Sequence, residues 1–315
     1  MMRRNADALS RWPDLPYEAW RETCATLHLW LQIVGKIRLA QCPWVNHSWH
    51  VALQVTATGL STRLMPYGAA SFQIDLDFVE HRLLVRVTDG RVLSLPLEAQ
   101  STATFYRRVM EALQTLGITV AIHTIPNELP DPTPFDQDEI HGSYDREYVN
   151  RYWRVLVQTE RVFEDFRARF IGKCSPVHFF WGSADLAVTR FSGRTAPEHP
   201  GGVPHLPDWV AREAYSHEVS SAGFWAGGEQ YPHATFYSYA YPEPPGFAIA
   251  DVRPNAARYD EALKEFVLPY EEMRNSASPD AALMEFLQTT YEAAATLSAW
   301  NRDALERSDN RASPA

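Results

Sequence analysis

The chain has 315 residues, 45% of them hydrophobic, so it can bury a substantial core and is long for one domain. Its net charge of −10 argues against nucleic acid as a partner, because nucleic-acid recognition usually needs a basic face. There is no secretory signal, no apolar run near the ~18 residues of a membrane span, and no CxxC spacing among three cysteines, so we expect a cytoplasmic protein without a membrane partner.

The first half of the chain reads as a helix, a sheet and a second helix. Apolar residues recur at helical spacing from Trp20 to Val34. The strands that we expect next are residues 49–56, 71–78, 83–88 and 92–95, with a hairpin turn at Asp89-Gly90. A helix is predicted over 101–116 and ends at Gly117, and a further strand is predicted over 118–123.

A segment rich in proline and acidic residues separates two parts of similar length. Residues 126–142 contain four prolines and five acidic residues. Proline fixes φ and removes a hydrogen-bond donor, so we expect this segment to run extended over the surface as a linker. It would divide an N-terminal half, residues 1–125, from a C-terminal half, residues 143–306. We expect residues 307–315 to form a polar, disordered tail.

The second half repeats the order of elements. A helix is predicted over 144–171 and a short one over 256–263. The last helix begins with Ser278 as N-cap and Pro279 in its first position. The strands that we expect are residues 177–181, 186–191, 217–224, 233–241 and 265–268.

Short matches between the halves suggest an internal duplication. Cys42 precedes Trp49 by seven residues, as Cys174 precedes Trp181, and LPLE at 95–98 is matched by LPYE at 268–271. The alternative is chance similarity between apolar patterns. We therefore predict an α+β fold of two similar helix–antiparallel sheet–helix halves, related by a pseudo-twofold axis.

The candidate site lies in residues 178–241, which concentrate aromatic residues, histidine and glycine and contain no lysine. Strand alternation places His233, Tyr237 and Tyr239 on one face, which suits either a pocket wall or the wet side of a half-exposed strand. Arg190 shares its face with aliphatic residues and needs a partner, which could be a protein carboxylate or an anionic ligand. Arg194 follows a glycine turn and could hold the same anion.

The leading hypothesis is binding, with or without turnover, of a small anionic organic ligand. Arg190 or Arg194 would hold the anion. Histidine has an ordinary pKa near neutrality, so His178, His217 or His233 would be the acid–base group. The residues that would pack the body of the ligand are Trp181, Trp225, Tyr237 and Tyr239.

Two other classes of function stay open. The three histidines, with Glu218 or Glu229, could serve a metal-dependent hydrolase or oxygenase, although no metal-binding spacing such as HExxH is present and His217 and Glu218 should point to opposite faces. Exposed tryptophan and tyrosine could instead contact another protein. A homo-oligomer is compatible with either hypothesis, and no motif specifies a cofactor.

Long runs of the chain resemble a known family. The runs are LPYEAWRET at 15–23, QIVGKIRL at 32–39, HFFWGSADLAVTRFSGR at 178–194, SAGFW at 221–225 and FYSYAYPEP at 236–244. They are similar to those of a widespread bacterial family catalogued as a domain of unknown function, whose members are about as long as this chain. The resemblance covers nearly the whole chain and implies one shared architecture, but it implies no activity, substrate or catalytic residue.

Overall fold

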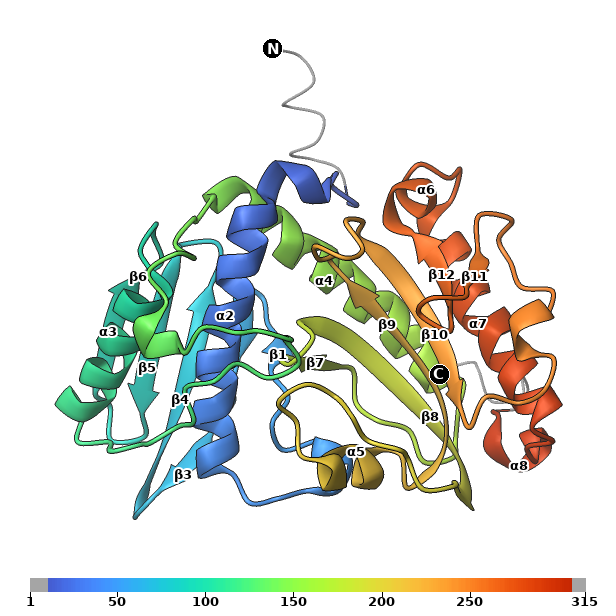
Figure 1. The fold of residues 1–315 in the computed structure, drawn as a ribbon, viewed down its shortest axis with the longest axis horizontal. Helices are drawn as coiled ribbons and strands as arrows, with labels where there is room; N and C mark the ends of the chain where they lie inside the picture. The colour runs from blue at the N-terminus through green and yellow to red at the C-terminus, as the bar shows by residue number, and fades with distance from the viewer. Residues whose placement is uncertain (1–10, 308–315) are drawn as a thin grey trace, which may run out of the picture.

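Residues 11–307 are described by a computed structural model of the chain. The fold is α+β, with two antiparallel sheets of six strands each (Figure 1). The first part of the chain contains α2 (Tyr17–Gln41), η1 (Asn46–Ser48), β1 (Gln54–Val55), β2 (Gly59–Ser61), β3 (Met65–Tyr67), β4 (Ala70–Asp77), β5 (Arg82–Val87), β6 (Val92–Pro96) and α3 (Thr102–Thr115).

The second part follows the short helix η2 (Phe135–Gln137). Its elements are α4 (Arg146–Ala168), β7 (His178–Phe180), β8 (Asp185–Thr195), α5 (Asp208–Ala214), β9 (His217–Trp225), β10 (Thr235–Tyr241), η3 (Phe247–Ile249), β11 (Arg258–Asp260), β12 (Glu265–Pro269), α6 (Tyr270–Arg274), α7 (Pro279–Leu297) and α8 (Arg302–Leu305).

The two sheets meet at their edges. The first has the order β1-β2-β4-β5-β6, with β3 also paired to β4, and the second has the order β11-β12-β10-β9-β8-β7. Leu53, just before β1, exchanges both backbone hydrogen bonds with Phe179 of β7, at 2.8 and 3.0 Å. One apolar core contains residues from both halves, and α2 contacts both α3 and α4. The halves are therefore packed together, whereas the predicted duplication and domain boundaries stay predictions.

Helices cover one face of the second sheet. Both α4 and α7 pack against its strands, α4 on β8 and α7 on β9 and β10 (Figure 1). Strand β8 presents Leu186 and Val188 to these helices, and their neighbours on β9 and β10 include Phe224 and Phe236, which are fully buried. This apolar layer leaves the opposite face of the sheet to other parts of the chain.

Three predicted elements differ from the structure. The strand predicted over 49–56 is shorter: residues 49–51 form a turn after His47 and Ser48, which both have φ of 58°, Leu53 forms an isolated bridge, and the strand is only Gln54–Val55. Residues 118–123 contain no strand, and the amide of Thr119 donates to the hydroxyl of Tyr67. The helix predicted over 256–263 is strand β11 and a turn, in which the carboxylate of Asp260 accepts the amides of residues 262 and 263.

Several predicted turns and helix ends are correct. Gly90 has φ of 94° in the β5–β6 turn, and Gly117, with φ of 73°, follows α3. Pro279 is the first residue of α7, although the Ser278 side chain forms no capping hydrogen bond. Sequence reasoning missed α5 altogether, because seven residues with few apolar positions carry little periodic signal.

Part of the proline-rich segment is buried and bonded to helix α3. Phe135 is fully buried and Asp138 is 1% exposed. The Asp138 backbone carbonyl accepts the amide of Ala103 at 2.9 Å, and its carboxylate accepts the amide of His141 at 3.0 Å. The segment thus anchors the beginning of α3. Most of the predicted disordered tail, residues 308–315, lies outside the described residues.

Candidate functional site

The second sheet separates the predicted site residues into two groups. Along β8, Leu186, Val188 and Arg190 face the helices. Asp185, Ala187, Thr189 and Phe191 alternate with them and lie on the other side, which we call the open face. Because antiparallel neighbours share a face, the register extends the open face through Trp225, Tyr237, Tyr239, His178 and His217.

Arg190 lies on the helix side and is enclosed by the protein. Its side chain is 1% exposed, and its guanidinium lies 3.4 Å from the ring centroid of Phe166 and 4.3 Å from that of Tyr291. The guanidinium also donates to the backbone carbonyl of Phe166. Burial lowers the pKa of Arg190 to about 10. These contacts give Arg190 a packing role between the sheet and helices α4 and α7.

Arg194 is also occupied by the protein. It forms a salt bridge of 2.7 Å with Glu218 and donates to the carbonyl of Ser298 at 2.6 Å, so it caps the C-terminal end of α7. Glu218 therefore faces the helices while its neighbour His217 faces the opposite way, as alternation predicts. The two arginines and the tyrosines do not surround one cavity. Neither Arg190 nor Arg194 is therefore placed to hold an anionic ligand on the open face.

The centre of the open face is a hydrogen bond that crosses a strand. The Tyr237 hydroxyl, on β10, donates to the carboxylate of Asp185, on β8, and Gly223 of β9 lies between them. A Cβ atom on Gly223 would lie 2.3 Å from the Tyr237 hydroxyl oxygen and from ring atom Cζ. The absence of a side chain at Gly223 therefore lets the tyrosine ring lie flat over β9 and reach the acid.

Three carboxyl groups gather at this end of the face. Asp185 is 8% exposed, and burial, with the nearby charge of Glu128, raises its pKa to about 7. Burial and the charge of Asp185 likewise raise the pKa of Glu265, on β12, to about 7. Burial also raises the pKa of Glu128, whose carboxylate accepts the Ser183 hydroxyl. Within residues 11–307 no arginine, lysine or histidine forms an ion pair with any of the three.

Tyrosines and small residues complete the acidic end of the open face. Tyr239 lies beside Tyr237 with ring planes 17° apart, and its hydroxyl is 2.9 Å from that of Tyr215. Tyr237 and Tyr239 are both half-buried. Beside them the floor consists of Ala187, Gly223, Thr189 and Ser221, and the last two hydroxyls are 2.8 Å apart. The floor beside the two rings therefore consists of small side chains, two of which carry hydroxyl groups.

The three candidate histidines are not brought together. His178 is 3% exposed beside Trp49, and burial lowers its pKa to about 4. His217 lies near His47, with ring centroids 6.1 Å apart. His233 is exposed beside Tyr231 at the end of the β9–β10 hairpin. Within the described chain no group of three or more metal-ligating side chains is placed to hold an ion.

The two candidate tryptophans differ in role. Trp181 is 6% exposed, and its indole N–H donates to the carbonyl of Val51 at 3.0 Å. A Cβ atom on Gly35 of α2 would lie 2.2 Å from the Trp181 ring, so this glycine allows the two halves to pack closely. Trp181 is therefore part of the scaffold. Trp225 is half-buried on the open face and is paired with Asp185 across the strands.

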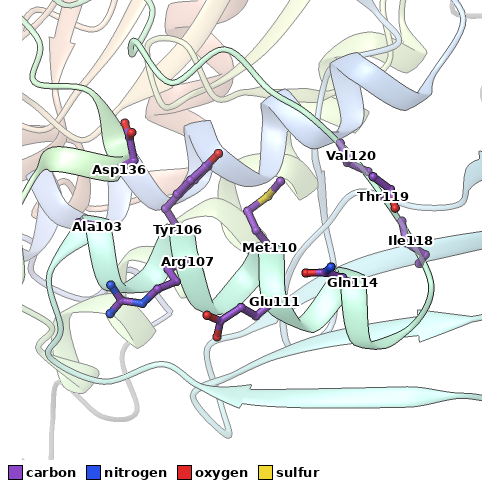
Figure 2. A pocket seen from close by; sticks show the side chains of 10 residues that line it. All are labelled: Ala103, Tyr106, Arg107, Met110, Glu111, Gln114, Ile118, Thr119, Val120 and Asp136. Atoms are coloured by element: carbon purple, nitrogen blue, oxygen red, sulfur yellow. The ribbon is translucent and has the colours of Figure 1, made fainter.

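Other surface features lie away from the open face. A shallow groove of about 490 Å³ runs between α3 and the segment after it, and Figure 2 shows Tyr106 and Met110 on its helix side. It contains none of the predicted site residues. An exposed aromatic pair, Trp44 and Trp209, has ring centroids 4.6 Å apart where η1 meets α5. This pair is an exposed aromatic surface of the kind that the interaction hypothesis requires.

Sequence reasoning missed the carboxyl groups. Asp185 was available from alternation, because it shares its face with Thr189, and the polar start of an apolar strand is a usable signal. Glu265 had the same signal at the start of β12. Glu128 had none, because only the tertiary fold brings the proline-rich segment to Ser183.

The comparisons with known proteins identify the family. The model of a family described as "Family of unknown function (DUF5996)" matches residues 12–307, so the chain belongs to that family. No curated protein and no solved structure matches the chain. Among the described residues, no helix has the length and apolar character needed to cross a membrane.

Proposed function

We propose that the protein binds a small organic ligand on the open face of the second sheet, between Asp185 and the tyrosines of β10. The observation that carries this proposal is the Tyr237–Asp185 hydrogen bond across Gly223. It keeps a carboxyl group oriented under half-buried aromatic rings, and sites of this kind combine apolar walls with a few oriented polar groups.

The charge of the site favours a basic ligand over the anionic one expected from the sequence. The charge of Glu128 disfavours ionisation of Asp185, and the charge of Asp185 disfavours ionisation of Glu265. Within the described residues no cation forms an ion pair with any of the three. An ammonium group placed near Asp185 would do so, and the rings of Tyr237 and Tyr239 can stabilise a cation through their faces. Arg190 and Arg194 take no part, because both are bound to protein groups.

Turnover would use the same groups. A carboxyl group with a pKa near 7 can donate or accept a proton at neutral pH. Tyr237 would orient that carboxyl group, and the Tyr239–Tyr215 pair would supply a second hydroxyl near the ligand. The proposal therefore covers a binding protein and an acid–base enzyme, and both depend on Asp185.

Isothermal titration with benzylamine and its anionic analogue benzoate tests the proposal. We expect benzylamine to bind more tightly, and to release protons at pH 6.5 because the ammonium group lowers the pKa of Asp185. Asp185→Asn should weaken benzylamine binding at least tenfold, whereas Asp75→Asn, on the first sheet, should leave it unchanged. Preference for benzoate, or equal binding by Asp185→Asn, would contradict the proposal.

A further inference from the structure

A lysine and a histidine from different halves meet at the other end of the open face. The Lys173 amine lies 2.7 Å from Nε2 of His47. Lys173 is held beside β8, because its carbonyl accepts the amide of Phe191 at 3.0 Å. Phe191 lies six residues from Asp185 along β8, which corresponds to about 20 Å at the rise of an extended strand. The Lys173–His47 pair is thus separate from the acidic end, and the inference below goes beyond the proposed function.

The hydrogen bonds determine where the proton of His47 lies. Nδ1 of His47 is 3.0 Å from the carbonyl oxygen of Ala214, which can only accept, so Nδ1 carries the hydrogen. Nε2 is then a free acceptor for the Lys173 amine. Burial lowers the pKa of His47 and keeps the ring neutral. His47 is therefore a base in direct contact with the amine.

The surroundings favour an amine that can lose its proton. The Lys173 amine lies 4.8 Å from the ring centroid of Phe191 and 5.4 Å from that of Trp49. Among the described residues no carboxylate forms an ion pair with it, and desolvation lowers its pKa. Lys173 is an exposed residue, so a small molecule can reach its side chain. A lysine whose pKa is lowered and whose nitrogen contacts a neutral base is suited to attack on a carbonyl group.

The backbone at His47 is unusual as well. His47 and Ser48 are consecutive residues with φ of 58°, a conformation that is unfavourable for side chains other than glycine. Such strain persists where the surrounding contacts require it and is often found at functional sites. Here it directs the imidazole between Ala214 and Lys173.

We propose that Lys173 forms an imine with a small aldehyde. The ammonium group passes a proton to Nε2 of His47, and the free amine attacks the carbonyl carbon, forming a C–N bond while the carbonyl oxygen takes a proton from water. The hydroxide formed in this step removes a proton from the nitrogen, which leaves a neutral carbinolamine and restores the water. His47 then gives its proton to the hydroxyl of the carbinolamine, the nitrogen lone pair forms the C=N bond, the C–O bond breaks and water leaves. Ammonium plus aldehyde thus gives protonated imine plus water, and His47 is neutral again.

Reductive trapping tests this inference, because the chain has only three lysines. The full-length protein is treated with benzaldehyde and sodium cyanoborohydride at pH 7.5, and benzylation is measured on each lysine by peptide mass spectrometry. Lys264, exposed in the turn after β11, is the internal control. We expect Lys173 to react at least tenfold faster than Lys264. Equal rates would overturn the proposal, and this comparison needs no variant.

Two variants separate chemistry from packing. His47→Gln should slow the labelling of Lys173 at least tenfold and leave Lys264 unchanged, because general acid–base catalysis typically contributes about 10²–10⁴-fold. Lys173→Arg keeps the charge over the rings and should keep the melting temperature, but should lose the label. Undiminished labelling of Lys173 in a folded His47→Gln protein would overturn the role of His47. Tyr237→Phe should not affect labelling, which makes this test independent of the proposed function.

Discussion

Replacing Gly223 by alanine should displace Tyr237 and break its bond to Asp185. The new Cβ atom would lie 2.3 Å from the tyrosine hydroxyl and 2.6 Å from ring atom Cε1, far inside van der Waals contact. Tyr239 lies beside the ring, with centroids 6.1 Å apart, and the hydroxyl is bound to Asp185, so a shift of the ring would disturb both contacts. Overpacking of this kind costs about 1–3 kcal/mol. Loss of a hydrogen bond to a carboxylate costs about 1.5–3 kcal/mol.

Taken together, we expect Gly223→Ala to lower the free energy of unfolding by about 3 kcal/mol. A chain of 315 residues has an unfolding entropy of about 0.7 kcal/mol/K near its midpoint, so the melting temperature should fall by about 4–5 °C. Circular dichroism during thermal and urea unfolding measures both quantities. The same variant should also lose benzylamine binding, because the orientation of Asp185 depends on Tyr237.

A double-mutant cycle isolates the contact. In a Tyr237→Ala background the added methyl group meets no ring, so Gly223→Ala should cost less than about 1 kcal/mol, giving a coupling of about 2 kcal/mol. Equal destabilisation in the two backgrounds would refute the reasoning, since it would mean that the glycine serves the backbone of β9 rather than the path of the tyrosine.

Three further predictions concern charge and burial. Arg190→Met should change the free energy of unfolding by less than about 1.5 kcal/mol, because replacing a buried charge by an apolar side chain of similar size often leaves stability unchanged. Benzylamine binding should stay intact, and a large loss of binding would show that Arg190 belongs to the site. The pKa of Asp185 is raised from 3.8 to about 7, so the folded state holds a proton that the unfolded state loses; between pH 4 and 7 this contribution to stability should fall as pH rises, by on the order of a few kcal/mol, and urea titrations should show a shallower slope for Asp185→Asn than for the wild type, with the contribution of Glu265 remaining. The pKa of His178 is lowered from 6.5 to about 4, so its contribution has the opposite sign and is lost as pH falls from 6.5 to 4; a His178→Phe protein that is as acid-sensitive as the wild type would contradict this.

Strand alternation was the most informative signal in the sequence. It placed Arg190 with aliphatic residues, separated His217 from Glu218 and put Tyr237 and Tyr239 on one face, and the register confirms each of these assignments. Alternation is a local property of an extended chain, so it needs no tertiary information. It does not say which face the helices cover, and for that reason the arginines were assigned to the same site as the tyrosines.

Contacts between segments far apart in the chain could not be predicted from the sequence. Glu128 joins the acidic end only because the proline-rich segment passes Ser183, 55 residues further along the chain. His47 and Lys173 are 126 residues apart, and their contact depends on a turn with two unusual φ values. Neither pair has a sequence spacing that would reveal it. The helix predicted over 256–263 failed for a related reason, because its composition suits a helix while pairing with β12 stabilises strand β11.

A crystal structure of the protein soaked with benzylamine tests the central claim most directly. The account predicts one molecule on the open face of the second sheet, with its ammonium group within hydrogen-bond distance of the Asp185 carboxylate and its ring against Tyr237 or Tyr239. A molecule bound only in the groove beside α3, or no bound molecule at concentrations that saturate binding in solution, would contradict it.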